Sequence, residues 1–414
     1  MQPPEPWSNW AGNITYRPAR LFEPTTPEEV VDIVAAASTQ GRTVRAAGTS
    51  HSSTPLSLTG DTIVNLGRMA GITGVDRAAH RVSLLPGTRV NAIGPALWEH
   101  GLALKNQGDI DAQQFAGAIS TGTHGSGRRL QSFSGSVRGL TAVTGTGEVV
   151  TIDDSDHDRL AAAQVGLGLT GIFTSIDLDV RDAFFIHEAI RYWTLDELYE
   201  RWDEEFERRL HFSFFWYPAH ASPGIFNMRV PDDGRDLADT VYVKRYDEVP
   251  LDAADDLAAF KELPADRVDR PYRIYPEIPT DVFHELEYMI PFEHGKKAMA
   301  ELREFLYTRF PDNIHPVEVR CVARDTAYLS PQYERDNIVI AVHCDDLATG
   351  EPFLRAVSDL LAPYGARPHW GKLHWFDDDH LEAAFPALDR FRRVRREIDP
   401  QGTFLNDYLR PLFT

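Results

Sequence analysis

The sequence predicts a chain of mixed helices and strands that folds into two domains. At 414 residues it is long enough to bury two hydrophobic cores. Up to about residue 181, strand-like runs alternate with helical periods, which is typical of an α/β layer. From Asp182 the sequence changes to longer charged helices and aromatic runs. A second domain is therefore expected to begin there.

The opening part carries start and stop signals for a helix from Pro27 to about Gln40. Thr26 stands at the cap position, proline follows at the first helical position, and Gly41 ends the run. Gly145-Thr146-Gly147 separates two β-type runs, which predicts a hairpin. The other elements expected here are strands over 61–66, 74–76, 81–85 and 172–180 and helices over 90–100 and 160–164.

The stretch from Val44 to Ser53 is the centre of this first part. Its small residues allow a close backbone approach to a ligand, and successive N–H groups in such a turn form a nest for anions. His51 stands in the middle of the turn. Taken alone, such a turn is more often an ordinary surface loop; the functional alternative is a loop that holds a pyrophosphate.

The segment from Asn106 to Gly127 is dense in glycine, alanine, serine and threonine. Such a backbone has few side chains with which to form a core, and it packs against something flat or tightly curved. A flexible linker is the alternative interpretation. Phe115 and Ile119 lie inside the segment, however, and favour a ligand plane.

Residues 166–171 have the spacing G-x-G-x-x-G. The dinucleotide-binding fingerprint needs a strand before the glycines and a helix after them, so that the pyrophosphate meets a helix N-terminus. Here a short helix is expected before the glycines and the β-branched run from Ile172 follows them. The order is inverted, and a Rossmann-type nicotinamide site is rejected.

The second part combines helices with an acidic connection. Residues 232–271 are acidic and punctuated by proline, which indicates an exposed connection with one helix. Further elements expected from periodicity are helices over 195–209, 293–310 and near 385–398 and an aromatic strand over 212–218.

Two later strands carry polar side chains at alternating positions. In the run 317–322 the alternation places Glu318 and Arg320 on one face. In the run 337–343 it places His343 on the same face as Asn337. Without further context, Glu318 and Arg320 are best interpreted as a cross-strand ion pair.

Composition excludes several classes of function. The formal net charge of −20 opposes nucleic acid or an anionic membrane as the main partner. The start Met1 to Trp7 has no signal-peptide pattern and no long apolar run occurs, so a cytoplasmic protein without membrane insertion is expected. Cys321 and Cys344 are expected to be buried thiols. The run 377–380 reads as a solvated helix start, and no metal is predicted.

Four pieces of the sequence together resemble one family, the flavin-linked oxidases of the vanillyl-alcohol-oxidase type. They are the His51 loop and the runs 116–125, 367–372 and 399–406, which span nearly the whole chain. Within the family, residues 9–16 are similar to alditol oxidases, and residues 214–218 are similar to the aldonolactone (gulono-, galactono- and arabinonolactone) oxidases.

The resemblance implies an α+β fold in which a two-part α/β FAD-binding domain of the PCMH type lies under a cap domain with an antiparallel sheet. The domains are expected at 1–181 for FAD, 182–370 for the cap and 371–414 for a return to the FAD domain. By the same resemblance His51 matches the histidine bonded covalently to the flavin 8α-methyl group, and Ser50 stands where the family usually has glycine. The positions that match cofactor contacts are Arg45, Gly48, Thr49, Ser50, His51, Ser52, Gly117, Thr121, Gly122, Thr123, His124, Gly125, Gly171, Ile172 and Asn406. His124 is equally interpretable as a structural histidine.

The resemblance also implies the catalytic set. Glu318 would hold the substrate hydroxyl or accept its proton, while Arg320 and Lys372 would stabilise the alkoxide and the reduced flavin. Asp109 and His343 stand where alditol oxidases have a serine and a threonine near the substrate, so the substrate-binding pocket is expected to differ. These two positions are larger and more polar here.

Gly108 matches the position over the flavin where a missing side chain leaves oxygen a path. The predicted function is therefore an oxidase that moves hydride from a polyol or sugar lactone to FAD and reduces molecular oxygen to hydrogen peroxide, with a monomer favoured. One alternative is a dehydrogenase of the same fold that uses a cytochrome or quinone. The other is a non-catalytic flavin- or sugar-binding protein.

Overall fold

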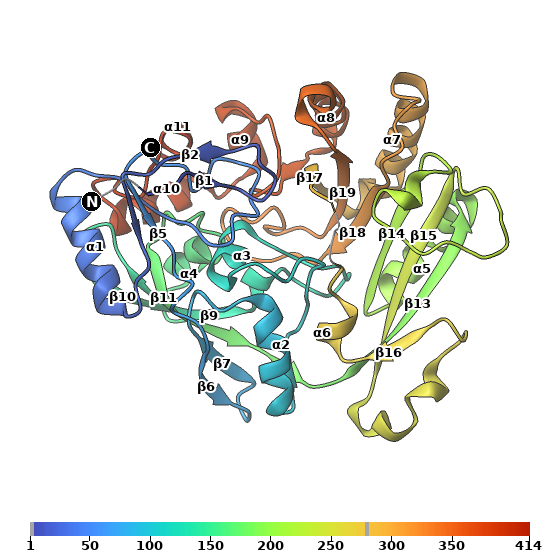
Figure 1. Cartoon of the computed structure of the whole chain (residues 1–414), viewed down its shortest axis with the longest axis horizontal. Coiled ribbons are helices and arrows are strands. Elements are labelled where there is room, and N and C mark those ends of the chain that lie inside the picture. Colours follow the sequence, from blue (N-terminus) through green and yellow to red (C-terminus); the bar gives the residue numbers. More distant parts are fainter. Residues whose placement is uncertain (1–3, 278–280) are drawn as a thin grey trace.

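A computed structural model describes residues 4–277 and 281–414. Met1 to Pro3, part of the N-terminus expected to lack a signal, lie outside the described residues. Figure 1 shows helices and strands gathered in two lobes, with both chain ends in the first lobe. Among the described residues, no helix is long and apolar enough to cross a membrane.

The first lobe contains a small parallel sheet beside the helix predicted at residue 27. This helix, α1 (Pro27–Thr39), begins where expected, because the Thr26 side chain caps it by accepting from the Glu29 N–H at 3.3 Å. The sheet has the strand order β3-β5-β4 and consists of β3 (Arg20–Phe22), β5 (Thr62–Val64) and β4 (Val44–Ala46). Strand β4 leads directly into the His51 loop.

An antiparallel five-stranded sheet forms the second layer of this lobe. The predicted hairpin is present, with Val143 paired to Val149. Helix α4 (His157–Gln164) precedes the G-x-G-x-x-G run and a strand follows it, which confirms the inverted order. The sheet has the order β10 (Val149–Asp153), β9 (Val137–Val143), β11 (Ile172–Asp179), β7 (Arg81–Leu84) and β6 (Ile72–Asp76).

Helices close the core of the first lobe, and some of them come from the far end of the chain. Its apolar cluster joins residues 30–180 to residues 327–333 and to the C-terminal residues from Trp370 onward. The domain boundaries predicted at residues 181 and 370 stay a prediction. The remaining elements are β1 (Trp7–Ser8), β2 (Thr15–Tyr16), α2 (Val90–Glu99), β8 (Leu102–Ala103), α3 (Phe115–Thr121), β12 (Arg181–Asp182), α9 (Asp378–Ala384), α10 (Leu388–Ile398) and α11 (Arg410–Phe413).

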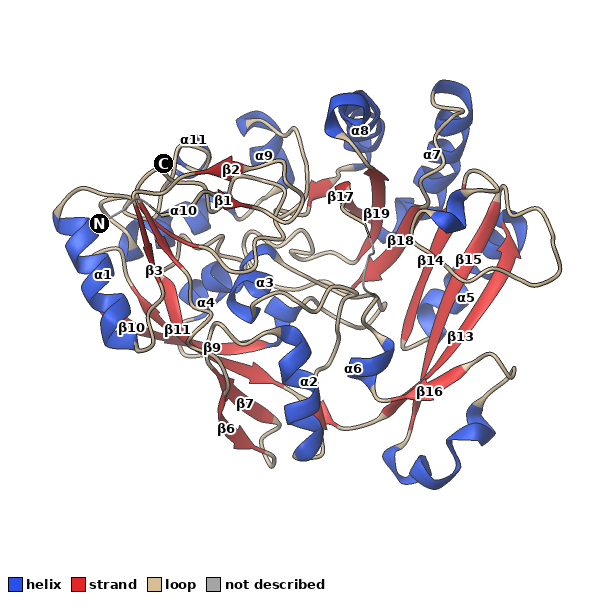
Figure 2. Cartoon of the chain, viewed as in Figure 1, coloured by secondary structure: helices blue, strands red, loops and turns tan. Residues whose placement is uncertain are grey.

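The second lobe is built on an antiparallel eight-stranded sheet (Figure 2). Its strand order is β16 (Arg267–Asp269), β13 (Phe185–Thr194), β15 (Thr240–Val249), β14 (His211–Tyr217), β18 (Val317–Val322), β19 (Asn337–Cys344), β17 (His284–Pro291) and β20 (Arg367–Pro368). One face packs an apolar cluster against α5 (Leu195–Arg208), α7 (Gly295–Arg309) and α8 (Leu347–Leu361). The short helix α6 (Pro271–Ile274) follows β16. The opposite face of the sheet carries the polar residues described below.

The prediction for residues 232–271 was wrong in its central part. Instead of one exposed connection, this stretch contains β15, in which Val241, Val243 and Tyr246 are fully buried. The acidic flanks obscured an alternating apolar pattern that is typical of a strand. Residues 232–236 and the 3₁₀ segment Leu251–Phe260 with the residues 261–265 after it are largely exposed, as expected. Both cysteines are free and buried, as predicted.

Candidate active site

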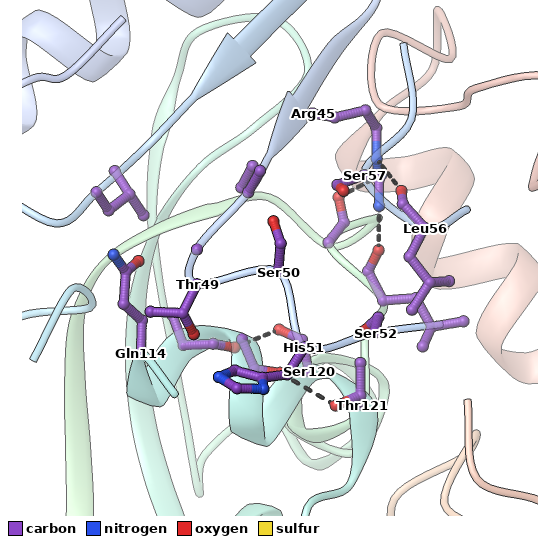
Figure 3. Close-up of a pocket in the computed structure, with 18 of the residues that line it drawn as sticks. Arg45, Thr49, Ser50, His51, Ser52, Leu56, Ser57, Gln114, Ser120 and Thr121 are labelled. Atoms are coloured by element: carbon purple, nitrogen blue, oxygen red, sulfur yellow. Dashed lines mark hydrogen bonds between the residues drawn. The ribbon is translucent and has the colours of Figure 1, made fainter. Parts of the chain in front are cut away.

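A pocket of about 1060 Å³ lies in the first lobe, next to the His51 loop (Figure 3). Its walls are mostly backbone and small side chains from three segments: residues 45–57, 113–121 and 167–173. The predicted cofactor residues that line it are Arg45, Gly48, Thr49, Ser50, His51, Ser52, Gly117, Thr121, Gly171 and Ile172.

The His51 loop has the properties of an anion nest. The backbone N–H groups of residues 48 to 52 have no hydrogen-bond partner within the described residues. The carbonyls beside them are occupied, since Trp10 N–H donates to Ser50 O at 2.8 Å and Asn9 Nδ2 donates to Ser52 O at 2.9 Å. Unpaired N–H groups lining a pocket fit a pyrophosphate. The loop therefore suits FAD.

His51 is held neutral at the boundary of this pocket. Burial, with help from the nearby charges of Lys372 and Arg89, lowers its pKa to about 4. Its ring lies 5.7 Å from that of Trp10, measured between centroids. A neutral imidazole has a nitrogen lone pair available for bonding.

Other predicted cofactor residues have structural partners. The buried Arg45 guanidinium donates to the carbonyls of Leu56, Leu167 and Phe404 at 2.8, 2.6 and 2.7 Å. It thus ties together three loops around the pocket while also lining it.

Asn406 lies outside the pocket linings. Its side-chain amide donates to the carbonyls of Pro55, Leu56 and Leu58 at 2.9, 3.3 and 2.8 Å. Gly122 and Gly125 also lie outside, the former at the left-handed end of α3. We assign all three to shaping the loops that form the walls.

A second pocket, of about 880 Å³, lies against the polar face of the eight-stranded sheet. Gln113 lines both pockets, and a smaller cavity bordered by His51, Gln113 and Lys372 lies between them. The structure brings together here every predicted substrate-side residue. These are Gly108, Asp109, Glu318, Arg320, His343 and Lys372, together with Thr123 and His124.

Glu318 and Arg320 lie side by side on β18, as the alternation predicted. Glu318 Oε2 is 2.9 Å from an Arg320 guanidinium nitrogen, whereas Glu318 Oε1 has no hydrogen-bond partner within the described residues. Burial raises the pKa of Glu318 to about 8, against the opposing influence of Arg320. This buried carboxyl group has one oxygen left for a ligand.

Two glutamates on β17 hold the two cations of this pocket. Glu287 lies 2.7 Å from an Arg320 guanidinium nitrogen and 3.0 Å from His124 Nε2. Burial alone would raise its pKa, but Arg320 and His124 hold the pKa of Glu287 well below its usual value. His124 thus has a structural partner, as one of the two sequence interpretations expected.

Glu285 plays the same part for Lys372, with which it forms an ion pair. Burial alone would raise the pKa of Glu285, but Lys372 and the neighbouring His343 ring, whose Nε2 lies 3.7 Å from Glu285 Oε1, bring it down to about 2. Burial lowers the pKa of Lys372, yet Glu285 and Glu287 outweigh this and keep it raised. Lys372 is therefore a fixed cation between the two pockets.

Asp109 belongs to a second group of charges. Its carboxylate lies 3.3 Å from Lys244 Nζ and 3.6 Å from Arg320, and Lys244 is itself 3.2 Å from Glu277. Burial alone would raise the pKa of Asp109, but Lys244 and Arg320 lower it. Asp109 is an anion at the pocket wall, held by a lysine that the sequence gave no reason to select.

Gly108 has a packing reason to be glycine. A Cβ atom there would lie 2.6 Å from the carbonyl oxygen of His124, which is closer than real contacts allow. The missing side chain at this wall is therefore explained by chain packing, whether or not it also admits oxygen.

Sequence reasoning missed several residues of this pocket. The alternating Glu285 and Glu287 in the run before Pro291 were a visible signal, because they follow the same pattern as Glu318 and Arg320. His369, at the pocket wall, has its pKa lowered to about 4 by burial. Other residues missed in this region include Gln113, Lys244, Glu277, Phe226, Met228 and Phe283.

Comparisons with known proteins match two large regions of the chain. Residues 18–153 match a family described as an FAD binding domain, and residues 256–412 match one described as D-arabinono-1,4-lactone oxidase. The L-gulono-1,4-lactone dehydrogenase of Mycobacterium tuberculosis is 32% identical to this chain, and the alditol oxidase of a Streptomyces species is 31% identical. The L-gulonolactone oxidase of Bos taurus is 27% identical. Each of these alignments covers 98% of both chains.

Solved structures show the same fold. The cholesterol oxidase of B. sterolicum superposes with a TM-score of 0.82 at 17% identity, covering 99% of this chain and 96% of the other. Together, the fold and the matched FAD-binding region define an FAD-dependent oxidoreductase that acts on CH–OH donors. More narrowly, the chain belongs to the aldonolactone and alditol oxidase branch of the vanillyl-alcohol-oxidase-type flavoproteins.

Proposed function

We propose that this protein oxidises a CH–OH group of an aldonolactone or alditol and passes the electrons through FAD to molecular oxygen, which gives hydrogen peroxide. Bound FAD supplies the hydride acceptor of this reaction. The observation that carries the proposal is Glu318 Oε1, a buried carboxyl oxygen without a protein partner in the described residues, in the pocket that adjoins the FAD-side pocket. That atom suits a substrate hydroxyl.

The charged residues of the substrate-side pocket have separate roles in this proposal. Hydride leaves a carbon readily only as the hydroxyl on that carbon loses its proton, and Glu318 with a pKa of about 8 is suited to take it. Arg320, 2.9 Å from Glu318, stabilises the negative charge that develops on the substrate oxygen. Lys372 supplies a second fixed positive charge towards the FAD side.

We also propose that His51 holds FAD covalently through a ring nitrogen. The support is its neutral ring and its position where the first pocket meets the cavity leading to the second. Acid precipitation of the purified protein tests this, because covalent flavin stays with the pellet. The same treatment of His51→Ala should release all flavin into the supernatant. A yellow wild-type supernatant above a colourless pellet would contradict the bond.

A dehydrogenase that uses a cytochrome or quinone is the second candidate. It is favoured by the dehydrogenase name of the M. tuberculosis relative, and Gly108 no longer argues against it, because packing alone requires glycine there. The cytoplasmic location and the monomeric state expected from the sequence stay predictions.

The experiment measures peroxide release by the aerated holoenzyme with gulono-, galactono- and arabinono-1,4-lactones and with xylitol and sorbitol. A parallel series replaces oxygen with an artificial electron acceptor under anaerobic conditions. Peroxide at a rate that matches substrate consumption supports the oxidase. Turnover only with the artificial acceptor supports the dehydrogenase. Substrates that bind without bleaching the flavin absorbance would overturn both and support a binding protein.

A further inference from the structure

Ser50, the residue directly before His51, has an unusual backbone conformation. Its φ angle is +57°, in the left-handed region that glycine adopts freely and residues with a Cβ rarely adopt. The conformation bends the chain at the centre of the N–H groups of residues 48 to 52. A serine in this place needs support from its surroundings.

The N-terminal hairpin, residues 7–16, in which β1 pairs antiparallel with β2, supplies that support. Trp7 Nε1 donates to Ser50 Oγ at 2.6 Å, and the Trp10 N–H donates to the Ser50 carbonyl at 2.8 Å. Two asparagines of the same segment extend the contact, since Asn9 Nδ2 and Asn13 Nδ2 each lie 2.9 Å from the carbonyls of Ser52 and Ser53. The hairpin thus binds the loop from the side chain of Ser50 to the carbonyl of Ser53.

The hairpin also forms part of the pocket itself. Trp7, Asn9, Ile14 and Tyr16 line the FAD-side pocket, although the matched FAD-binding region begins only at residue 18. Tyr16 fixes the far end of the loop through a hydrogen bond from its hydroxyl to the carbonyl of Ser57 at 3.0 Å. A part of the cofactor site therefore precedes the region that sequence matching assigns to it.

We propose that the hairpin over residues 7–16 is a cofactor clip, in which Trp7 holds Ser50 in its left-handed conformation and so presents the N–H groups of residues 48 to 52 to FAD. Trp7 is a positioning residue: it acts through Ser50. In this chain the indole hydrogen bond performs the task that a glycine at position 50 would perform without a partner. The proposal depends on FAD binding alone and not on the substrate or the electron acceptor.

The test compares two small changes at position 50 for which the proposal predicts different FAD affinities. Ser50→Ala removes the Oγ partner of Trp7 but keeps the Cβ that disfavours the left-handed conformation. Ser50→Gly removes both. Each is made in a His51→Ala background so that FAD binding is reversible, and the dissociation constant of FAD is measured by titrating flavin-free protein.

Ser50→Ala and Trp7→Phe should each weaken FAD binding by about threefold to tenfold, the range that one net hydrogen bond represents. Ser50→Gly should bind FAD at least as tightly as the parent protein. The decisive variant is Trp7→Phe combined with Ser50→Gly, which should recover the parent affinity, because glycine needs no indole to adopt this conformation.

Trp216→Phe is the matched control, since it removes another indole hydrogen bond, from Nε1 to Asp239 at 2.9 Å, in the second lobe. It should leave FAD affinity unchanged. Unaltered affinity in both Ser50→Ala and Trp7→Phe would overturn the proposal. So would a Trp7→Phe defect that Ser50→Gly fails to repair, because the tryptophan would then act by general packing. None of these measurements uses substrate turnover, so their failure is separate from failure of the proposed oxidase activity.

Discussion

The two pockets are lined by different kinds of chemical group. The FAD-side pocket is made of backbone N–H groups and small side chains, mostly from the contiguous stretches 45–57 and 113–121. The substrate-side pocket has an apolar wall that includes Phe215, Phe226 and Phe283. Facing it are long charged side chains that meet from separate strands: Glu285 and Glu287 on β17, Glu318 and Arg320 on β18. The FAD-side pocket therefore depends mainly on residues that are close in sequence. The substrate-side pocket depends on the register that brings residues of separate strands together.

This difference separates the two tasks of the molecule. Backbone N–H groups hold an anion with a geometry that side-chain substitution changes little. Ion pairs between strands fix charges at chosen points, and each charge depends on its neighbours. Substitutions in the substrate-side pocket should therefore alter the chemistry and the local stability while the bound flavin stays in place.

Glu318→Gln is expected to have the largest effect. The amide cannot accept the substrate proton, so kcat should fall by about 10²- to 10⁴-fold. In the wild-type enzyme kcat/KM should rise with pH through an apparent pKa near 8, because Glu318 acts as a base only when ionised. The variant should lose this rise and keep its flavin. Steady-state kinetics and the flavin absorbance measure both effects.

Asp325→Asn is the matched control. Asp325 is another buried carboxyl group with a raised pKa, about 6, but it lies outside both pockets and is hydrogen-bonded to Ser330. Its substitution should lower stability and spare kcat. Equal losses of kcat in the two variants would mean that any buried carboxyl group disturbs the enzyme, and the role given to Glu318 would fail.

Arg320→Ala should have the next largest effect, this time on stability. The guanidinium pairs with Glu287 and Glu318 together, at 2.7 and 2.9 Å. Its loss leaves the buried Glu318 carboxyl group without a partner among the described residues and leaves Glu287 with His124 alone. Breaking a buried ion pair from one side costs about 3–5 kcal/mol. Denaturant unfolding of the holoprotein measures the change. Arg320→Lys keeps the positive charge and should lose less stability. A loss below about 1 kcal/mol in Arg320→Ala would contradict the prediction, because losses of that size are typical of solvent-exposed ion pairs.

Much of the first lobe was predictable from local signals. Thr26 and Pro27 located the start of α1, and the glycines at 145 and 147 located a hairpin, because caps and turns need particular residues at particular positions. Strand β15 was not predicted. Its acidic surroundings suggested solvent, and its burial follows from the neighbouring strands β13 and β14, which are distant in sequence.

The candidate site, like the fold, was predictable only in part. The resemblance to a family selected Glu318, Arg320 and Lys372, and alternation correctly placed the first two on one face. Their partners on β17 and the pairing of Asp109 with Lys244 could not be predicted, since strand order and register are needed to know what lies opposite. Asn406 is the opposite case. The resemblance selected it as a cofactor contact, but its side chain donates to carbonyls of the 55–58 loop and lies outside the pocket linings.

Asn406→Ala is expected to lower stability moderately, and it tests whether Asn406 supports the loops or contacts the cofactor. The variant leaves the Leu58 carbonyl without a donor and the Leu409 N–H without an acceptor, and it removes one of the two donors to the Pro55 carbonyl, which keeps the Leu58 N–H. Lost hydrogen bonds of this kind cost about 1–3 kcal/mol. Thermal unfolding of flavin-free protein should show most of the loss. A loss seen only with FAD bound would mean that Asn406 contacts the cofactor directly.

The smallest predicted effect, taken per pH unit, is a pH dependence of stability that belongs to Glu318. Its pKa is about 8 in the folded protein against 4.5 for an exposed glutamate, so between these values the folded state keeps a proton that the unfolded state has lost. Stability should therefore fall as pH rises through this window, by at most about 1.4 kcal/mol per pH unit. Glu285 has a lowered pKa of about 2 and acts in the other direction, since its contribution is lost as pH falls below 4.5. The two windows do not overlap. Unfolding free energies at pH 5, 6 and 7 should decline more steeply in the wild type than in Glu318→Gln, whereas parallel curves would mean that Glu318 is already ionised across this range.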